Sequence, residues 1–416
     1  MAIVKPFRGL RPRNDLVAKV ACPPYDVLSS EEARIMAQNN PLSFLHVAKS
    51  EIDLKPDIDL YDDRVYEKAR ENFQKFIKDG VLVRDGKDSF YIYQQIMGDH
   101  RQVGLLACVS VDDYLNNIIK KHELTRPDKE LDRTKHIDCV GANTGLVFLT
   151  YRAKAEIDWI IESCVKRQPV YDFVDEQTVR HTVWIVDDSA TIRNLAEAFG
   201  RLDAIYIADG HHRSASSCRV RDIRKEKHPD HTGREEYNYF TGVLFPDNQV
   251  KILPYNRAVA TLNEMSAETF LQKIGERGFE VEAAPSNDPH NPERQHTFGM
   301  YLEGKWYRLT ARKEIIVDDD PIERLDVQIL QKNLLGPILG IEDPRKDKRI
   351  DFIGGIRGLG ELKKRVDSKR LRVAFALFPA TVDDLMRIAN AGRIMPPKST
   401  WFEPKLKSGL VMHLLN

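Results

Sequence analysis

Apolar residues follow two different spacings along the chain. In residues 60–77 they recur every three or four positions, which predicts an amphipathic helix that ends at Asp79-Gly80. In residues 90–111 apolar runs lie on either side of Gly98-Asp99, which predicts a β-hairpin. The short apolar run at residues 43–47 predicts a strand. Together these patterns predict a mixed fold of the α+β class.

Residues 181–217 alternate strand and helix patterns before a tight turn. HTVWIVDD predicts a strand, ATIRNLAEAFG predicts a helix, and the apolar residues up to Ile207 predict a second, buried strand. This order is typical of a β-α-β unit. Farther along, residues 240–259 predict a hairpin around Pro246-Asp247-Asn248.

The turn Asp209-Gly210-His211-His212-Arg213 is a candidate anion site. The small residues after it suit the start of a helix, whose first backbone N–H groups have no partner inside the helix. Gly210 allows a ligand to approach closely, and Arg213 offers a planar fork of donors to a phosphate or carboxylate. A surface turn with incidental charges is the simpler alternative. Two histidines and an arginine directly after a buried strand favour a functional site.

A second charged segment, IIKKHELTRPDKELDR at residues 118–133, carries further candidate chemistry. Such a run is ordinarily a solvated helix face. Here it follows an apolar pair, Pro127 interrupts it, and it mixes a histidine and Thr125 with the charges. These features favour a loop that binds a phosphate and a metal ion. The candidate residues in it are Lys120, Lys121, His122, Glu123, Arg126, Lys129 and Arg133.

The loop Pro23-Pro24-Tyr25-Asp26 is rigid because each proline fixes its own φ. It precedes a helix that Ser29 or Ser30 is expected to cap. The loop either holds that helix or presents Tyr25 and Asp26 to a ligand, and both interpretations stay open.

Two later clusters are also candidates for ligand contacts. Asn256 and Arg257 end the hairpin expected at residues 240–259, and we expect them to contact the substrate. Lys398, Ser399 and Thr400 supply a cation and two hydroxyls in a proline-bounded loop. They either bind a phosphate or form a capped turn before the last strand.

Composition limits the class of protein. The 416 residues contain 63 basic and 63 acidic residues, so no global charge attracts nucleic acid or an anionic membrane. Five scattered cysteines without a C-x-x-C pair argue against a disulfide framework or a zinc ribbon. With no signal peptide or apolar span, we expect a soluble, cytoplasmic protein. The length suits several domains, and we expect borders that give regions 1–115, 116–260 and 261–416.

Several common catalytic motifs are missing from the sequence. It lacks the H-E-x-x-H pattern of zinc hydrolases, the G-x-S-x-G elbow and the G-x-G-x-x-G fingerprint. The glycine-rich stretch GGIRGLG has neither dinucleotide nor P-loop spacing. The clusters that remain favour binding of a nucleotide or a phosphoester.

The segment IYIADGHHRSASS is similar to a box of the ParB/sulfiredoxin-like superfamily, in which this turn holds nucleotide phosphates. More broadly, PPYDV, IKKHELTRPDKELDR, ADGHHR, LPYNR and MPPKSTWFEPKLKSGL together resemble one family of uncharacterised bacterial and archaeal proteins, often labelled ParB-like. The resemblance implies a nucleotide-binding core in residues 116–260. His211 stands where sulfiredoxin has its catalytic cysteine, which disfavours sulfinic acid reduction. No helix-turn-helix follows the box, and the neutral charge disfavours a ParB-type DNA clamp. The free-serine kinase branch, with an Asp-Gly-His-x-Arg type turn, fits best.

This resemblance implies an enzyme that uses ATP or ADP with Mg²⁺ to phosphorylate a small hydroxyl metabolite, with L-serine as the specific expectation. Gly210 and Arg213 are then expected to hold phosphates. Asp209 or Glu123 is expected to bind Mg²⁺ or deprotonate the hydroxyl, and His211 or His212 to assist proton transfer. A nucleotide-binding switch and a DNA-binding partitioning protein are the alternatives. No membrane partner is expected, and a homodimer stays open.

Overall fold

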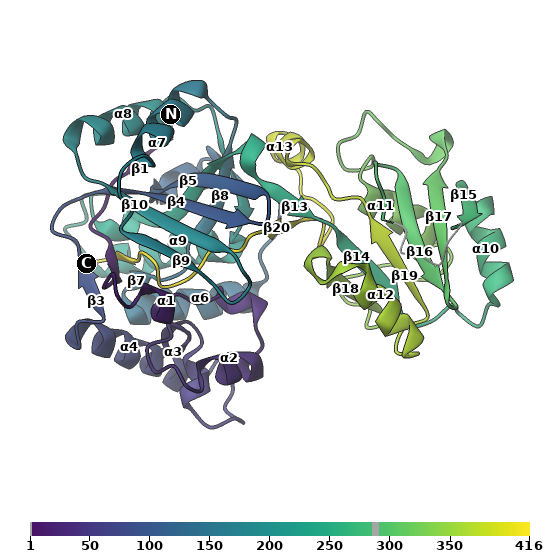
Figure 1. Ribbon diagram of the computed structural model, residues 1–416, viewed down its shortest axis with the longest axis horizontal. Coiled ribbons are helices and arrows are strands. Elements are labelled where there is room, and N and C mark those ends of the chain that lie inside the picture. Colours follow the sequence, from purple (N-terminus) through teal and green to yellow (C-terminus); the bar gives the residue numbers. More distant parts are fainter. Residues whose placement is uncertain (1, 285–290) are drawn as a thin grey trace. The chain divides into compact units, whose positions relative to one another are not determined.

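The computed structural model describes residues 2–284 and 291–416, which divide into two compact units (Figure 1). The first unit contains the chain up to Val250 together with Pro404–Asn416, and the second contains Lys251–Glu403. The division into residues 1–115, 116–260 and 261–416 stays a prediction. Both units combine helices with sheets, so the mixed α+β class is confirmed.

The first unit is built on one large sheet in the order β6-β11-β8-β12-β5-β4-β10-β9, with β1 beside β5. Most neighbours are antiparallel, whereas β12 with β8 and β11 with β6 are parallel. The expected hairpin around Gly98-Asp99 is confirmed, since Met97 of β4 pairs with His100 of β5. The strands are β1 (Val4–Lys5), β4 (Phe90–Met97), β5 (His100–Ser110), β6 (Ile119–Lys120), β8 (Val147–Tyr151), β9 (Tyr171–Val174), β10 (Arg180–Val186), β11 (Ile205–Asp209) and β12 (Tyr239–Pro246).

Helices cover this sheet and build a second core beside it. Buried residues of α7, α8 and α9 join alternate positions of β8 and β11, such as Leu149 and Ile207, in the main core. The second core packs the N-terminal helices around Phe44 and Phe73, and Met412 from the C-terminal segment completes it. The helices are α1 (Val17–Val20), α2 (Ser30–Ala37), α3 (Leu45–Ala48), α4 (Asp63–Lys78), α5 (Val111–Leu115), α6 (Pro127–Val140), α7 (Ala155–Cys164), α8 (Ser189–Gly200) and α9 (His211–Lys227).

Three short two-stranded pairings involve the ends of the chain or the link to the second unit. They join β2 (Leu10–Pro12) to β3 (Leu82–Arg84), β7 (Ala142–Asn143) to β21 (His413–Leu414), and β13 (Lys251–Leu253) to β20 (Trp401–Glu403). Because β21 pairs with β7, the C-terminal segment belongs to the first unit, where Figure 1 shows it in yellow among the purple and blue elements.

The strand pairings bring the two charged segments to one end of the sheet. Tyr206 of β11 pairs with Lys120 of the parallel strand β6, so residues 121–126 and 209–213 leave the sheet at the same end. Asp209 lies opposite Phe148 of the antiparallel strand β8, so the residues before β8 lie there too. This register positions the candidate site.

Four expectations from the sequence are wrong. Residues 43–47 contribute to helix α3 rather than a strand, because Phe44, Leu45 and Val47 are buried in a core shared with α4 and the composition of the segment does not decide between the two. The charged segment is a loop only up to Arg126, since Pro127 occupies the first turn of α6, where its missing N–H costs nothing. Residues 240–259 form no hairpin, because β12 pairs with β5 and β8. Strands β10 and β11 share the sheet but are not neighbours, so they form no simple β-α-β unit.

The second unit contains a six-stranded antiparallel sheet in the order β15-β17-β16-β19-β14-β18. Its core includes Tyr301, Trp306 and Phe375, all almost fully buried. The strands are β14 (Tyr255–Val259), β15 (Phe279–Ala283), β16 (Thr297–Leu302), β17 (Lys305–Ala311), β18 (Ile350–Gly354) and β19 (Val373–Leu377). The helices are α10 (Ala267–Glu276), α11 (Asp326–Leu330), α12 (Gly358–Asp367) and α13 (Val382–Asn390).

Across residues 2–284 and 291–416, none of the helices combines the length and the apolar character that crossing a bilayer requires.

The cap of α2 provides a test of local stability. Ser29, rather than Ser30, accepts the Glu32 N–H, and Glu32 in turn accepts the Ser29 N–H. We expect Ser29→Ala to lower the free energy of unfolding by about 1 kcal/mol, because the amide loses its partner. Ser29→Asp should keep most of the stability, since aspartate also caps helices. Urea unfolding followed by circular dichroism measures both, and equal losses in the two variants would contradict this role.

Candidate functional site

The turn between β11 and α9 depends on Gly210. This residue has φ +101° and ψ 28°, a conformation that residues with a side chain rarely adopt. A Cβ there would also lie 3.2 Å from Cζ and Nε of Arg213 and 3.4 Å from Cα of Val147. In the described chain no side chain caps α9. The amides of its first turn therefore face the space beyond the turn without a partner from the helix itself.

Asp209 is an ionised carboxylate between two cations. Its Oδ2 lies 3.2 Å from Nζ of Lys405 and 3.6 Å from Nη2 of Arg213. Burial alone would raise the pKa of Asp209, but the charges of Lys405 and Arg213 outweigh it and hold the pKa below its usual range. The strand end therefore carries a fixed negative charge that the two cations neutralise.

Arg213 is buried and only loosely paired. Its Nη2 lies 3.5 Å from Oδ2 of Asp26, its Nη1 donates to the Leu146 carbonyl, and its Nε has no partner among the described residues. Burial would lower the pKa of Arg213, yet Asp26 and Asp209 raise it above its usual value. The guanidinium thus stays charged and keeps a donor available for a ligand.

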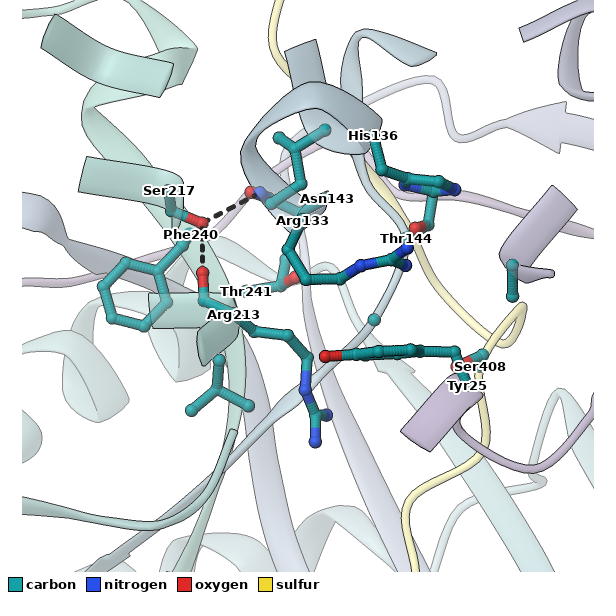
Figure 2. A pocket seen from close by; sticks show the side chains of 14 residues that line it. Tyr25, Arg133, His136, Asn143, Thr144, Arg213, Ser217, Phe240, Thr241 and Ser408 are labelled. Carbon is teal, nitrogen blue, oxygen red and sulfur yellow. Dashed lines mark hydrogen bonds between the residues drawn. The ribbon is translucent and has the colours of Figure 1, made fainter. Parts of the chain in front are cut away.

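A small cavity lies between Tyr25, Arg133 and Arg213 (Figure 2). The Arg133 guanidinium lies 4.1 Å from the centre of the Tyr25 ring, and the hydroxyl end of Tyr25 points toward Arg213. The Nε of Arg133 donates to Asp132 at 2.8 Å. The cavity has a volume of about 30 Å³, enough for roughly two water molecules. Its other polar lining residues are His136, Asn143, Thr144, Ser217, Thr241 and Ser408.

Three histidines, His122, His211 and His212, lie at or beside the turn. The Nε2 of His211 accepts the His122 N–H at 3.4 Å, and its Nδ1 lies 3.8 Å from Oε2 of Glu123. His212 points elsewhere, since its Nε2 accepts the Arg126 N–H at 3.0 Å. Burial lowers the pKa of all three rings, to about 4 for His122. The three imidazoles are therefore neutral near pH 7.

The remaining basic residues of the charged segment lie outside the cavity lining. The Nζ of Lys121 lies 4.4 Å from the centre of the Tyr114 ring, and that of Lys129 lies 5.4 Å from the centre of the Tyr61 ring. The exposed Arg126 pairs with Asp128 at 2.8 Å, and Lys120 ends strand β6. Of the basic residues in this segment, only Arg133 lines the cavity.

Several candidate residues of the second unit form contacts within that unit. The Oδ1 of Asn256 accepts the Leu377 N–H, and Arg257 donates to the carbonyls of Tyr255 and Pro397. Burial lowers the pKa of Arg257 to about 10. The Nζ of Lys398 lies 5.6 Å from the centre of the Tyr255 ring.

The neighbouring Ser399 donates to the Pro396 carbonyl, so its hydroxyl holds the loop that contains Thr400. Ligand binding by Asn256, Arg257, Lys398, Ser399 and Thr400 stays a prediction.

The sequence did not single out Lys405, Asp132, Thr144, Ser217 or Ser408 as site residues. Lys405 lies 196 positions from Asp209, and only the return of the C-terminal segment to the first unit brings the two together. Asp132 is one of the charged residues of segment 118–133 in the sequence, but its ion pair with Arg133 depends on the helical conformation of α6. No local pattern identifies the small hydroxyl residues.

Comparison with solved structures finds remote similarities. A mutant of a free serine kinase in complex with AMP is 13% identical, with a TM-score of 0.36 over 73% of this chain and 91% of that chain. A conserved hypothetical protein from Pyrococcus furiosus is 14% identical, with a TM-score of 0.35 over 74% and 95%. Truncated SbnI from Staphylococcus aureus is 11% identical, with a TM-score of 0.32 over 74% and 86%. At these scores the similarities carry no conclusion about function.

A search of curated proteins found no match. A family model does match most of the sequence, over residues 4–328. The chain therefore belongs to the family described as protein of unknown function, DUF1015.

Proposed function

We propose that this protein binds a nucleotide at the turn between β11 and α9 and transfers a phosphoryl group to a small hydroxyl metabolite, with free L-serine as the acceptor. One observation carries the proposal. A buried, charged arginine with an unpartnered Nε lies beside the uncapped N-terminus of α9, and Gly210 keeps the approach to both open. Backbone amides and a guanidinium that converge in this way suit phosphate oxygens.

The contacts of Arg213 explain why a ligand could compete for it. Its carboxylate partners lie at 3.5 Å and 3.6 Å, which is long for a charge-assisted hydrogen bond. A phosphate oxygen at ordinary distance would form a stronger bond, and the amides of the first turn of α9 would add to it. The cavity of about 30 Å³ is far smaller than a nucleotide. Only a phosphate or a substrate carboxylate would approach Arg213 and Arg133, and the rest of the ligand would lie outside.

Phosphoryl transfer places further demands on the site, because charge builds up on the phosphate oxygens and the attacking hydroxyl must lose a proton. Arg213 and Arg133 would offset the charge. Glu123 or Asp209 would take the proton, and the neutral His211 or His212 would assist its transfer.

The carboxylates also offer the oxygen ligands that Mg²⁺ prefers, and Mg²⁺ when bound would neutralise phosphate charge. Asp209 is already held by Lys405 and Arg213, whereas the side chain of Glu123 is 49% exposed. The geometry therefore favours Glu123 over Asp209 for contact with a metal–nucleotide complex.

Binding can be tested by titrating the full chain with ATP and ADP, with and without Mg²⁺, in a calorimeter. We expect Arg213→Lys to weaken nucleotide binding by about 10- to 100-fold, because lysine lacks the planar fork of donors. Arg219→Gln is the matched control, since this half-exposed arginine on the same helix pairs with Glu130. Its affinity should stay within about twofold of wild type. Equal affinities for wild type and a folded Arg213→Lys variant would contradict the proposed phosphate site.

Turnover needs a separate assay. With ATP or ADP, Mg²⁺ and a panel of amino acids, we expect phosphoserine as the product, detected by mass spectrometry. Glu123→Gln should lower kcat by about 100-fold or more, because the variant loses the carboxylate that would contact the metal ion or take the hydroxyl proton, and a general base alone typically contributes 10²–10⁴. Glu226→Gln, an exposed position on α9, should have no effect. Tight nucleotide binding without any phosphorylated product would overturn the kinase and favour a nucleotide-binding switch.

A further inference from the structure

His122, Glu123 and His211 form a cluster of metal-ligating side chains, called here the His-Glu-His cluster. One ligand atom from each residue lies within 4.8 Å of the other two. His122 and Glu123 follow β6, and His211 follows β11 by two residues. The parallel register of these two strands, with Tyr206 opposite Lys120, brings residues 88 or more positions apart to one place. The sequence lacks an H-E-x-x-H motif, but the fold brings together metal-ligating residues that are distant in the sequence.

His122 is the unusual member of the cluster. His122 is only 2% exposed, and within the described part of the chain neither of its ring nitrogens has a hydrogen-bond partner. A buried polar group without a partner destabilises a fold, so such a ring calls for an explanation. A neutral imidazole with free nitrogens is the form that binds a metal ion.

His211 lies against this ring in a position that suits a shared ion. The two ring centroids are 4.5 Å apart at an interplanar angle of 86°. The contacts of His211 are long, at 3.4 Å to the His122 N–H and 3.8 Å to Glu123. Little energy is therefore lost if either ring nitrogen turns to a metal.

We propose that the His-Glu-His cluster binds a borderline divalent transition-metal ion of the Zn²⁺ or Co²⁺ type, with His122, His211 and Glu123 as ligands and water completing the shell. Two imidazoles and a carboxylate are a donor set that Zn²⁺ uses in open sites, whereas Mg²⁺ prefers oxygen ligands. Bonds of about 2.0–2.2 Å require the ligand atoms to lie roughly 3.4 Å apart. The half-exposed side chain of Glu123, on the irregular segment after β6, can close the remaining distance.

Asp209 is excluded from this ligand set by its own partners, Lys405 and Arg213. The metal site thus lies next to the proposed phosphate site without using the carboxylate that balances Arg213. This inference goes beyond the proposed function, because the cluster would bind its ion in the absence of any nucleotide or acceptor. With that ion bound, Glu123 and His211 serve as its ligands, and the proton-transfer roles proposed above fall to Asp209 and His212.

The test uses the full chain after treatment with a chelator and the metal alone. We expect Zn²⁺ to bind with one-to-one stoichiometry in a calorimeter, and Co²⁺ to give the visible absorption of a low-symmetry site. His122→Gln and Glu123→Gln should each weaken Zn²⁺ binding by more than about 100-fold, since loss of even an outer partner costs 10–100-fold. The exposed position of Glu123 makes its variant the safer one for folding, which circular dichroism checks.

His413→Gln is the matched control. His413 is also buried, and its Nε2 lies 2.8 Å from a carboxylate oxygen of Glu236. This variant should bind Zn²⁺ as tightly as wild type. The inference is overturned if wild type takes up no stoichiometric Zn²⁺, or if Glu123→Gln binds it as tightly as wild type. No nucleotide is present in this experiment, so neither result tests nucleotide binding. The calorimetric titration with ATP and ADP tests that separately.

Discussion

The charge of Arg213 holds the candidate site together. From the first turn of α9 its guanidinium reaches Asp26 beside Tyr25, the Leu146 carbonyl ahead of β8, and Asp209 at the end of β11. Asp209 in turn binds Lys405 from the C-terminal segment. Four segments that are distant in sequence therefore meet around one buried cation. Because a buried charge is costly without partners, this arrangement constrains where each segment can lie.

Two groups of residues near the turn differ in electrostatics. In one group, Arg213, Arg133 and Lys405 are cations balanced by Asp26, Asp132 and Asp209. In the other group, His122 and His211 are neutral because burial outweighs nearby charge. A charged group suits an anion, and a group of neutral imidazoles suits a metal ion. Both groups include residues of the turn at Gly210, since Asp209 precedes this glycine and His211 and Arg213 follow it.

Much of this arrangement could be predicted from local sequence. The hairpin around Gly98-Asp99 and the strand, turn and helix at residues 204–217 follow from periodicity and from Gly210, which few other residues could replace. Glu123 and Asp26, candidates from two other segments, lie at that turn, 3.8 Å from His211 and 3.5 Å from Arg213. Their types were visible in the sequence, but their proximity was not, because it depends on the fold.

The other features could not be predicted from the sequence, because they depend on pairing between segments that are far apart in the chain. Nothing near Val250 indicates that the chain leaves the first unit there and returns at Pro404, so neither the pairing of β13 with β20 nor the ion pair of Lys405 could be read from the sequence. The composition of the segment Leu45–Ala48 suits a strand and a helix equally well, and packing on α4 decides between them. The His-Glu-His cluster depends on the register of β6 with β11, which sequence spacing does not encode.

The most direct measurement of the central claim is a crystal structure of the full chain with ADP and Mg²⁺. The account predicts phosphate oxygens within hydrogen-bond distance of the first amides of α9 and of the Arg213 guanidinium, with Asp26 displaced from it. Phosphates bound away from the turn at Gly210, with Arg213 still paired to Asp26, would contradict it.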